Sequence, residues 1–570
     1  MRHAAIAFVL FGWPALALDV ENRVDNFELL DHAGAAHELH YLSDMRAVVL
    51  MSHANACPAQ ADAVAALNAA RDAYESGGVA FLMVNSGDAR GEIAERAGEF
   101  GIGSPVLLDE AGIVGASLGF THAAETLVVR TNDWRVAWRG APGGLANALE
   151  AVLAESAMPA AETLAAVTGC EIAYPEATVA SYSDTIAPLL ADNCVTCHRQ
   201  GGIGPWAMTD YNMIRGFSPM IREVIRTRRM PPWHADPAYG HFANDRSLEP
   251  EEVRTLVAWI EAGSPRGEGP DPLAELDREW PTWGLGEPDL VIDIPPYEVP
   301  ASGVVEYQYP RVVNPLDRDV WVRATEIQPG DRQALHHVIT RFYTPNPEAE
   351  GGFGRRGGGL GGYVPGSVVR QYPPDTGTLL PAGARIVFQM HYTPYGKAIT
   401  DGSKLGIYLH DEPPKYQLGG TTLVNTKIRI PPHAKAHSES KSEVLERDVL
   451  LYSLLPHAHY RGKASDFVAH YPDGSSEVLL SVPNYDFNWQ TSYVLRNPKM
   501  LPAGTRIVHT TTWDNSTQNP ANPDPDREVP WGLQSWDEML FGAVSFRYLE
   551  AEETDSSEGF ARFQGSSAGE

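Results

Sequence analysis

Short apolar runs alternate with a long amphipathic segment in the first 150 residues. AVVLMS and VAFLMVN are β-like runs, the Ala-rich segment AQADAVAALNAARDAYES between them has helical periodicity, and ETLVVRT followed by RVAWRG is typical of a hairpin. The order strand, helix, strand and then paired strands is typical of a compact α/β unit. The pattern therefore predicts an α/β domain at 18–150, followed by a linker at 151–180.

The next stretch has mostly helical periodicity. Residues 181–267 end in the amphipathic segment EPEEVRTLVAWIEAG, whose Gly263 is suited to a C-terminal helix cap. The connector at 268–289 is rich in Pro and Gly, which favours a semi-rigid linker. We predict a small all-α domain over 181–267 and a domain boundary after it.

From residue 290 onward, short β runs are separated by Pro, Gly, Asn and Asp, which is the pattern of an all-β sandwich. The octapeptide LPAGARIV at 380–387 returns as LPAGTRIV at 501–508. A repeat of this kind predicts two similar β domains in tandem. We place them at 290–415 and 416–550.

Two further stretches are expected to lack regular structure. The Gly-rich run GGFGRRGGGLGGY at 351–363 is interpreted as a flexible loop, because no helix follows it as a phosphate-binding loop would require. The tail at 551–570 is polar and is predicted to be disordered.

Composition excludes some classes of partner. The chain has 570 residues, which is more than a single core organises, and its net charge is −29. A strongly acidic chain is a poor ligand for nucleic acid or anionic lipid, since both require a basic face. Residues 1–17 have the pattern of a secretory signal peptide, and no later apolar run is long enough to span a membrane. We therefore expect a periplasmic or secreted protein with no membrane span.

Two of the four cysteines form a c-type haem attachment motif. Cys194, Cys197 and His198 have the spacing CxxCH, in which the thiols bond to the porphyrin and the His is an axial iron ligand. The alternatives are a zinc half-site and a redox-active Cys pair, but no second Cys pair completes a zinc site. Met230, followed by two prolines, is the preferred sixth ligand. Other candidates for that position are Met208, Met213, Met220, His234 and His241. The segment is similar to the cytochrome c family and implies one covalent haem c.

Histidines in the β region suggest metal sites. His457 and His459 lie two residues apart, so on a strand they point to the same side. His336 and His337 are adjacent, so both can bind one metal only if a bulge turns one of them or if they use different ring nitrogens. Three His ligands suit zinc or copper, whereas two His with a thioether favour copper.

The order His336–His337, His391, His457-x-His459 and Met539 resembles the copper type II, ascorbate-dependent monooxygenases, the family of peptidylglycine α-hydroxylating and dopamine β-monooxygenases. The resemblance implies two jelly-roll sandwiches and two coppers per chain. His336, His337 and His391 would hold the electron-storing copper. His457, His459 and Met539 would be the catalytic residues at the copper that activates oxygen.

Three differences from that family bear on the substrate. The β region contains no Cys, so the disulfides of the animal enzymes are absent. Leu455 stands where the peptidylglycine enzyme has a carboxylate-binding Arg, and Phe541 and Ala543 stand at its Asn and Tyr positions. Loss of the Arg removes the carboxylate clamp, which disfavours a peptidylglycine and favours a more apolar substrate.

Cys57, followed by Pro58, comes directly after a predicted strand and before a helix, a position that resembles the thioredoxin-like redoxins and peroxiredoxins. A helix N-terminus lowers the pKa of a thiol and makes it reactive. Gln60 occupies the second Cys position of a CxxC motif, and Ala124 occupies the place of the usual cis-Pro. Cys170 is available as a disulfide or resolving partner. An active redoxin and a scaffold both remain open.

Taken together, these features predict a copper-dependent monooxygenase that hydroxylates a C–H bond of a small, apolar substrate with O₂. Electrons would be supplied through the covalent haem by an external donor, an ascorbate-like reductant or a redox protein. Two alternatives remain: a copper-binding or electron-transfer protein without catalytic activity, and a thiol oxidoreductase centred on Cys57.

Overall fold

The computed structural model describes most of the chain, and the predicted signal peptide, part of the first linker and nearly all of the polar tail lie outside the described residues. Those described are 19–156, 169–175, 178–346, 348, 352–364, 366, 369–550 and 553. Contacts divide the chain into two compact units. Unit 1 comprises Met1–Leu189, Ile214–Pro231 and Leu248–Gly269, and unit 2 comprises Leu190–Met213, Pro232–Ser247 and Pro270–Glu570.

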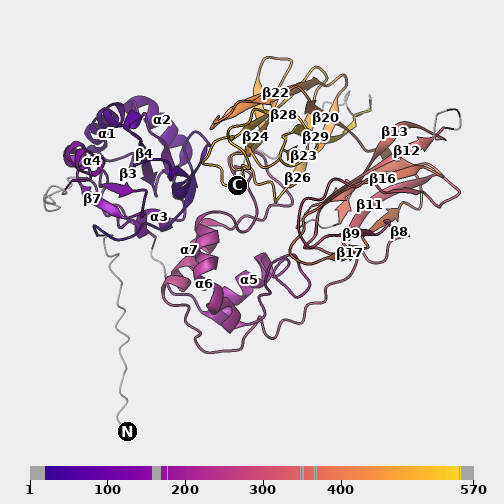
Figure 1. Cartoon of the computed structure of the whole chain (residues 1–570), viewed down its shortest axis with the longest axis horizontal. Helices are drawn as coiled ribbons and strands as arrows, with labels where there is room; N and C mark the ends of the chain where they lie inside the picture. The colour runs from indigo at the N-terminus through magenta and orange to yellow at the C-terminus, as the bar shows by residue number, and fades with distance from the viewer. Residues whose placement is uncertain are drawn as a thin grey trace, which may run out of the picture. The chain divides into compact units, whose positions relative to one another are not determined.

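Unit 1 is built on a five-stranded sheet with the order β5-β4-β3-β6-β7 (Figure 1). Strands β3, β4 and β5 are parallel, and β6 and β7 form the predicted antiparallel hairpin. This order is that of a thioredoxin-like α/β domain and confirms the α/β prediction. The elements are β1 (Glu28–Leu30), β2 (Ala36–Glu38), β3 (Ala47–Ser52), α1 (Gln60–Tyr74), β4 (Val79–Asn85), α2 (Arg90–Phe100), β5 (Val106–Leu108), α3 (Ile113–Ser117), β6 (Thr126–Arg130), β7 (Val136–Gly140) and α4 (Leu145–Leu153).

The central strand β3 shows why this sheet needs cover on both faces. All six of its residues are buried. Val49 and Met51 join the apolar cluster that also contains residues of α1 and α4, whereas Val48 and Leu50 join a cluster on the other face. A nearly continuous apolar run is therefore stable only between two layers, as expected for parallel strands in an α/β domain.

The helices expected over 181–267 do not form a unit of their own. They are α5 (Ala187–Asn193), α6 (Tyr211–Arg226) and α7 (Pro250–Glu261). Most of α6 and all of α7 belong to unit 1, whereas the CxxCH segment belongs to unit 2. The side chain of Arg226 in α6 donates to Ser117 Oγ at 3.0 Å, and Arg222 pairs with Asp25 at 2.7 Å. These contacts hold α6 to the α/β domain, and a separate all-α cytochrome domain is not shown.

The first β region contains two sheets that enclose one core. One has the order β10-β16-β12-β13, and the other has the order β19-β15-β11-β18-β8 with β14 beside β11. Phe342 and Phe388 from the first sheet share a buried cluster with Val322 and Ile407 from the second. The strands are β8 (Leu290–Asp293), β9 (Tyr297–Val299), β10 (Arg311–Val313), β11 (Val320–Gln328), β12 (Leu335–Pro345), β13 (Phe353–Tyr363), β14 (Arg370–Gln371), β15 (Thr376–Leu380), β16 (Arg385–Tyr392), β17 (Ile399–Asp401), β18 (Lys404–Leu409) and β19 (Tyr416–Gln417).

The second β region repeats this design with two four-stranded sheets, β20-β29-β23-β26 and β22-β27-β24-β25. Its core combines Leu454 and Val544 from the first sheet with Phe467 and Ile507 from the second. The strands are β20 (Gly419–Asn425), β21 (Arg429–Ile430), β22 (His437–Val444), β23 (Val449–His457), β24 (Gly462–His470), β25 (Ser476–Val482), β26 (Tyr493–Leu501), β27 (Arg506–Trp513), β28 (Val529–Pro530) and β29 (Leu540–Tyr548).

The repeated octapeptide has the same structural role in both sandwiches. In each copy the Pro-Ala-Gly segment forms a turn, with φ of 63° at Gly383 and 86° at Gly504. Because positive φ is costly for residues with a side chain, glycine suits this position. The turn leads into an interior strand of a four-stranded sheet, β16 in the first sandwich and β27 in the second. The described strands of residues 290–548 therefore form two similar β-sandwiches.

The prediction of a loop at 351–363 is wrong for its described part. Residues Phe353–Tyr363 form β13, which pairs antiparallel with β12 through several register shifts. Strand pairing uses backbone groups, so it does not require side chains with high β propensity. A Cβ on Gly357 would lie 2.1 Å from the ring of Phe342, so glycine allows β13 to lie flat against this buried ring.

The connector at 268–289 is anchored at several points to unit 2. Leu273 and Trp283 are buried, and the N–H of Gly284 donates to Glu326 Oε2 at 2.8 Å. This part of the connector is therefore packed against unit 2 at Leu273, Trp283 and Gly284. Among the described residues, no helix is long and apolar enough to cross a membrane.

Candidate metal centre

Three histidines of the first sandwich converge because of a β-bulge. Between β12 and β16, Leu335 pairs with Tyr392 and His337 with His391, so His336 is an extra residue in the ladder. On a regular strand adjacent residues point to opposite faces, whereas a bulge turns the extra residue. Of the two arrangements that would let His336 and His337 bind one metal, the structure therefore contains the bulge, at His336.

His336, His337 and His391 offer ligand nitrogens that all lie within 4.8 Å of one another. His336 Nε2 and His391 Nδ1 are buried and have no hydrogen-bond partner among the described residues. Burial lowers the pKa of His336 to about 3 and that of His391 to about 4, and it also lowers the pKa of His337 well below its usual value. Neutral imidazoles with unpaired nitrogens are the form that binds a metal, so this cluster fits a copper or zinc ion.

The second pair of histidines is oriented by its hydrogen bonds. His457 closes β23 and His459 follows it, with their ring centroids 5.2 Å apart. His457 Nδ1 donates to Gln490 Oε1 at 2.8 Å, and His459 Nδ1 donates to the Asp537 carbonyl at 3.2 Å. Both contacts leave Nε2 as the available nitrogen, which is how metal-binding histidines are commonly held. His459 Nε2 is buried without a partner among the described residues.

Glu538 connects this pair to the position of Met539. Glu538 Oε2 accepts the backbone N–H of His459 at 2.8 Å and that of Met539 at 3.2 Å. The same carboxylate accepts the N–H of Arg461 and the indole N–H of Trp513. Burial raises the pKa of Glu538 to about 7. The His-x-His turn and the Met539 backbone therefore meet at one buried carboxylate, although they are 80 residues apart in the sequence.

The two histidine groups lie next to each other. The ring centroids of His337 and His457 are 6.5 Å apart. Phe487 of the second sandwich stacks on His336 of the first at 4.7 Å, and its ring is 6.1 Å from His459. The structure thus brings together all five predicted histidine ligands, from two sandwiches that are separate in the sequence.

Sequence reasoning missed the residues that hold these imidazoles. Gln490, Glu538 and Phe487 orient ligand rings or their backbone, and Tyr307 stacks on His391 at 4.7 Å. Gln490, Phe487 and Tyr307 belong to no motif with recognisable spacing. Glu538 could have been found from the sequence, because it directly precedes the predicted ligand Met539.

An apolar surface adjoins His457. In the pairing of β23 with β29, His457 lies opposite Phe541 and Leu455 lies opposite Ala543. All four residues are partly exposed, whereas Leu454 and Val544 on the other face are buried in the core. The three residues at which the predicted resemblance implies a difference from the peptidylglycine enzyme therefore occupy one patch beside a predicted ligand. We call Leu455, Phe541 and Ala543 the apolar patch.

The CxxCH segment begins where α5 ends, and it closes in a tight turn. The N–H of His198 donates to the Cys194 carbonyl at 2.9 Å, and neither Cys194 nor Cys197 forms a disulfide. His198 Nδ1 donates to the Trp206 carbonyl at 3.2 Å, which leaves Nε2 as the available ligand nitrogen. The donor set therefore fits a c-type haem. Met230 lies in unit 1 and CxxCH in unit 2, so its role as sixth ligand stays a prediction.

Cys57 and Cys170 form a disulfide with Cα atoms 5.6 Å apart. Cys57 is buried just before α1, whereas Cys170 is exposed. The N–H of Ala123 donates to the Cys170 carbonyl and the N–H of Ile172 to the Thr121 carbonyl, which holds this segment beside the sheet. Close to Cys57, buried His53 and Gln60 each have a side-chain nitrogen without a partner among the described residues.

Loss of this disulfide is expected to destabilise unit 1. The bond closes a loop of 113 residues. Loop-closure entropy then predicts that Cys57→Ala/Cys170→Ala lowers the free energy of unfolding by about 5 kcal/mol. Urea unfolding with and without a thiol reductant measures this, because reduced wild type and the double variant should have the same midpoint. An unchanged midpoint in the double variant would contradict the assignment.

Comparisons with solved structures find proteins that are similar to part of this chain. No model of a protein family matches it, and no curated protein matches it. A hypothetical protein from Sinorhizobium meliloti 1021 is 21% identical, covers 28% of this chain and 96% of its own, and has a TM-score of 0.26. A putative thiol:disulfide interchange protein DsbE from Chlorobium tepidum is 17% identical, with 24% and 99% covered and a TM-score of 0.23. The peroxidoxin BcpB from Mycobacterium tuberculosis is 21% identical, with 24% and 95% covered and a TM-score of 0.21. Because these TM-scores are low, the description of unit 1 as thioredoxin-like is based on the order of the strands in its sheet.

Proposed function

We propose that this chain is a copper-dependent monooxygenase that hydroxylates a C–H bond of a small apolar molecule. One observation carries the proposal: five buried or half-buried histidines from two sandwiches converge, with His337 and His457 rings 6.5 Å apart. Such a concentration of neutral imidazoles is costly to bury without a ligand, because several of their nitrogens have no hydrogen-bond partner in the part of the chain that the structure describes.

The residues have separable roles in this proposal. His336, His337 and His391 would hold one copper, and His457, His459 and Met539 the other. Copper held there would supply one-electron redox chemistry with O₂. Gln490 and Glu538 keep the imidazole nitrogens aimed at the site, and Phe487 covers His336 from solvent.

The overall reaction needs two electrons and two protons in addition to O₂. One oxygen atom enters the substrate C–H bond to give an alcohol, and the other leaves as water. An external donor must supply both electrons, and we propose that the haem at Cys194 and Cys197 receives them. The apolar patch offers a substrate no charged or hydrogen-bonding side chain, which favours a hydrocarbon-like group beside His457.

Leu455→Arg is expected to impair turnover of an apolar substrate. The guanidinium would enter the apolar patch, where desolvating it opposes the binding of a hydrocarbon group. We expect KM to rise about tenfold or more, while copper content is unchanged. Leu455→Met is the matched control, since it retains an apolar side chain of similar volume. An unchanged KM in Leu455→Arg would remove the apolar patch from the substrate site.

Copper content and oxygen consumption test the proposal itself. The purified chain should bind two coppers and consume O₂ only when an electron donor and an oxidisable substrate are both present, with a panel of small apolar amines and amides as the first choice. A copper carrier or electron-transfer protein would bind copper without substrate-dependent O₂ uptake. That result would favour the non-catalytic alternative.

The Cys57–Cys170 bond supports a second candidate function, thiol–disulfide exchange in unit 1. Because Cys170 is exposed and Cys57 is buried before α1, an attacking thiolate would form a mixed disulfide with Cys170 and release Cys57 as the thiolate. Reduction of an external disulfide should then require both cysteines and should persist after copper is removed. Activity that survives in Cys57→Ala would exclude this function.

A further inference from the structure

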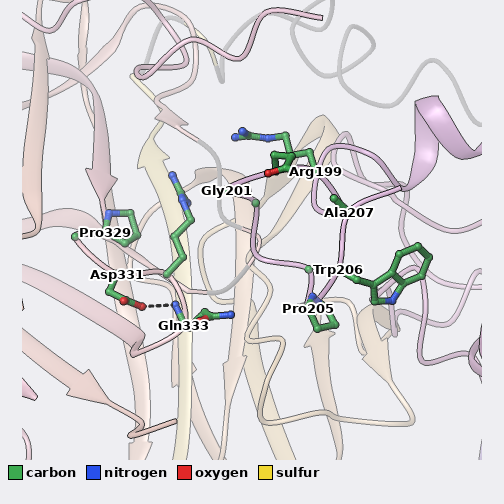
Figure 2. A pocket seen from close by; sticks show the side chains of 13 residues that line it. Arg199, Gly201, Pro205, Trp206, Ala207, Pro329, Asp331 and Gln333 are labelled. Atoms are coloured by element: carbon green, nitrogen blue, oxygen red, sulfur yellow. Dashed lines mark hydrogen bonds between the residues drawn. The ribbon is translucent and has the colours of Figure 1, made fainter. Parts of the chain in front are cut away.

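A cavity lies between the CxxCH segment and the first β-sandwich. Its volume is about 540 Å³, and residues 199–202 and 204–207 line one side, while the loop at 329–333 lines the other (Figure 2). Both sides belong to unit 2. Two residues after this loop, the chain enters β12 with His336 and His337. The cavity therefore adjoins both predicted redox centres through short stretches of chain.

Two guanidinium groups of this cavity form no ion pair within 4.0 Å among the described residues, although Arg332 is near enough to the Glu326 carboxylate and to the Tyr363 hydroxyl to counteract the rise in pKa that burial causes in both. Arg199 stacks over Trp280 with its Cζ 4.5 Å from the ring centroid, and its Nε is buried without a hydrogen bond. Arg332 donates to the neutral Gln328 Oε1 at 3.2 Å. The two positive charges are close enough that Arg332, together with burial, lowers the pKa of Arg199. Like charges repel, so an arrangement of this kind favours a bound anion.

The acidic residue of the cavity is already engaged. Asp331 Oδ1 accepts the N–H groups of Gln333 and Ala334 at 2.9 and 3.0 Å, and Oδ2 accepts the hydroxyl of Tyr395 at 2.8 Å. Figure 2 shows the bond to Gln333 at the foot of the cavity. These contacts direct the Asp331 carboxylate to the adjoining backbone and to Tyr395, and neither arginine forms an ion pair with it.

Both walls are held in place by close backbone approaches. A Cβ on Gly204 would lie 2.7 Å from His198 Nδ1, and the N–H of Gly204 donates to the Cys197 carbonyl at 2.9 Å. On the other wall, a Cβ on Gly330 would lie 2.4 Å from the backbone nitrogen of Gly402. Gly204 thus allows the CxxCH segment to fold back closely on itself, and Gly330 allows the loop at 329–333 to lie close to Gly402. Both walls of the cavity are therefore part of the fold of unit 2.

We infer that this cavity is an anion site, in which Arg199 and Arg332 bind a carboxylate between the CxxCH loop and the strand that carries His336 and His337. The functional role of this anion site depends on the proposed haem and copper sites. The carboxylate has two possible sources: a propionate group of the haem attached at Cys194 and Cys197, or a small organic acid from solution that donates electrons there. Arginine pairs recognise both through the same charge-assisted hydrogen bonds.

The test uses the full-length, haem-bearing chain with malonate as the free carboxylate probe. Isothermal titration calorimetry and the haem reduction potential are measured for wild type and Arg332→Gln. If the anion comes from solution, malonate binds the wild type, and the variant binds it about tenfold to a hundredfold more weakly. If it is a propionate, malonate does not bind. The variant then has a lower haem potential that varies with pH, because the unpaired propionate titrates.

Arg278→Gln is the matched control. Arg278 also stacks over Trp280, but it bonds the Ala191 carbonyl and Asp192 and does not line the cavity. The Arg278→Gln variant should bind malonate with an affinity within about twofold of that of the wild type. Its haem reduction potential should show no added dependence on pH. If neither readout distinguishes Arg332→Gln from wild type, the inference is overturned. A chain that carries no haem but binds malonate through Arg332 would refute the proposed haem and retain the anion site.

Discussion

Met539→Ile should reduce monooxygenase turnover at least about a hundredfold while the three-histidine site keeps its copper. The change removes the thioether and retains a side chain of similar volume, so the fold should be preserved. Glu538 would still bind the backbone N–H groups of His459 and residue 539, because those bonds do not involve the Met539 side chain. The loss would therefore report the sulfur as a ligand.

Copper per chain, measured by elemental analysis, and initial rates on the same samples check this result. Met500→Ile is the control, since Met500 is a partly buried methionine in β26 of the same sandwich. His391→Ala should do the reverse and release copper from the first site while the second stays loaded. Normal hydroxylation by Met539→Ile would show that Met539 is not a ligand.

Replacing both Cys194 and Cys197 by Ala is expected to eliminate covalent haem completely. The two thiols are the proposed attachment points, and neither forms a disulfide in the structure. The mass of the denatured chain and its haem absorbance measure the loss, after production in a host with cytochrome maturation. Copper content should be unchanged, since no copper ligand lies in this segment.

A kinetic measurement then tests whether the haem serves the copper sites. In reduced wild type mixed with O₂ and substrate, haem oxidation should follow product formation, and it should slow in His391→Ala. Haem that stays reduced while product forms would show that electrons enter by another route. Met230→Ala should change the haem spectrum and lower its potential if Met230 is the sixth ligand. An unchanged spectrum would transfer that role to another Met or to His234.

Local patterns were sufficient for much of the fold. The apolar run AVVLMS and the Ala-rich helix predicted the α/β domain, because a strand buried on both faces and an amphipathic helix leave periodic signals in the chain. The repeated LPAG-x-RIV predicted two like sandwiches for the same reason. The Gly-rich run at 353–363 was misinterpreted because a paired strand is stabilised by its backbone bonds and neighbours, which composition does not reveal.

By itself, the sequence identified the candidate residues for the chemistry: the CxxCH motif, the five histidines and Cys57. Only the tertiary structure decided their arrangement. The bulge at His336, the carboxylate of Glu538 between two distant segments, and the approach of His337 to His457 all depend on contacts between residues far apart in the chain. The same holds for the division of the predicted cytochrome segment between two units and for the cavity at Arg199 and Arg332. Spacing along a chain constrains neighbours within a few residues, whereas these features are set by packing and strand register, which have no local signal.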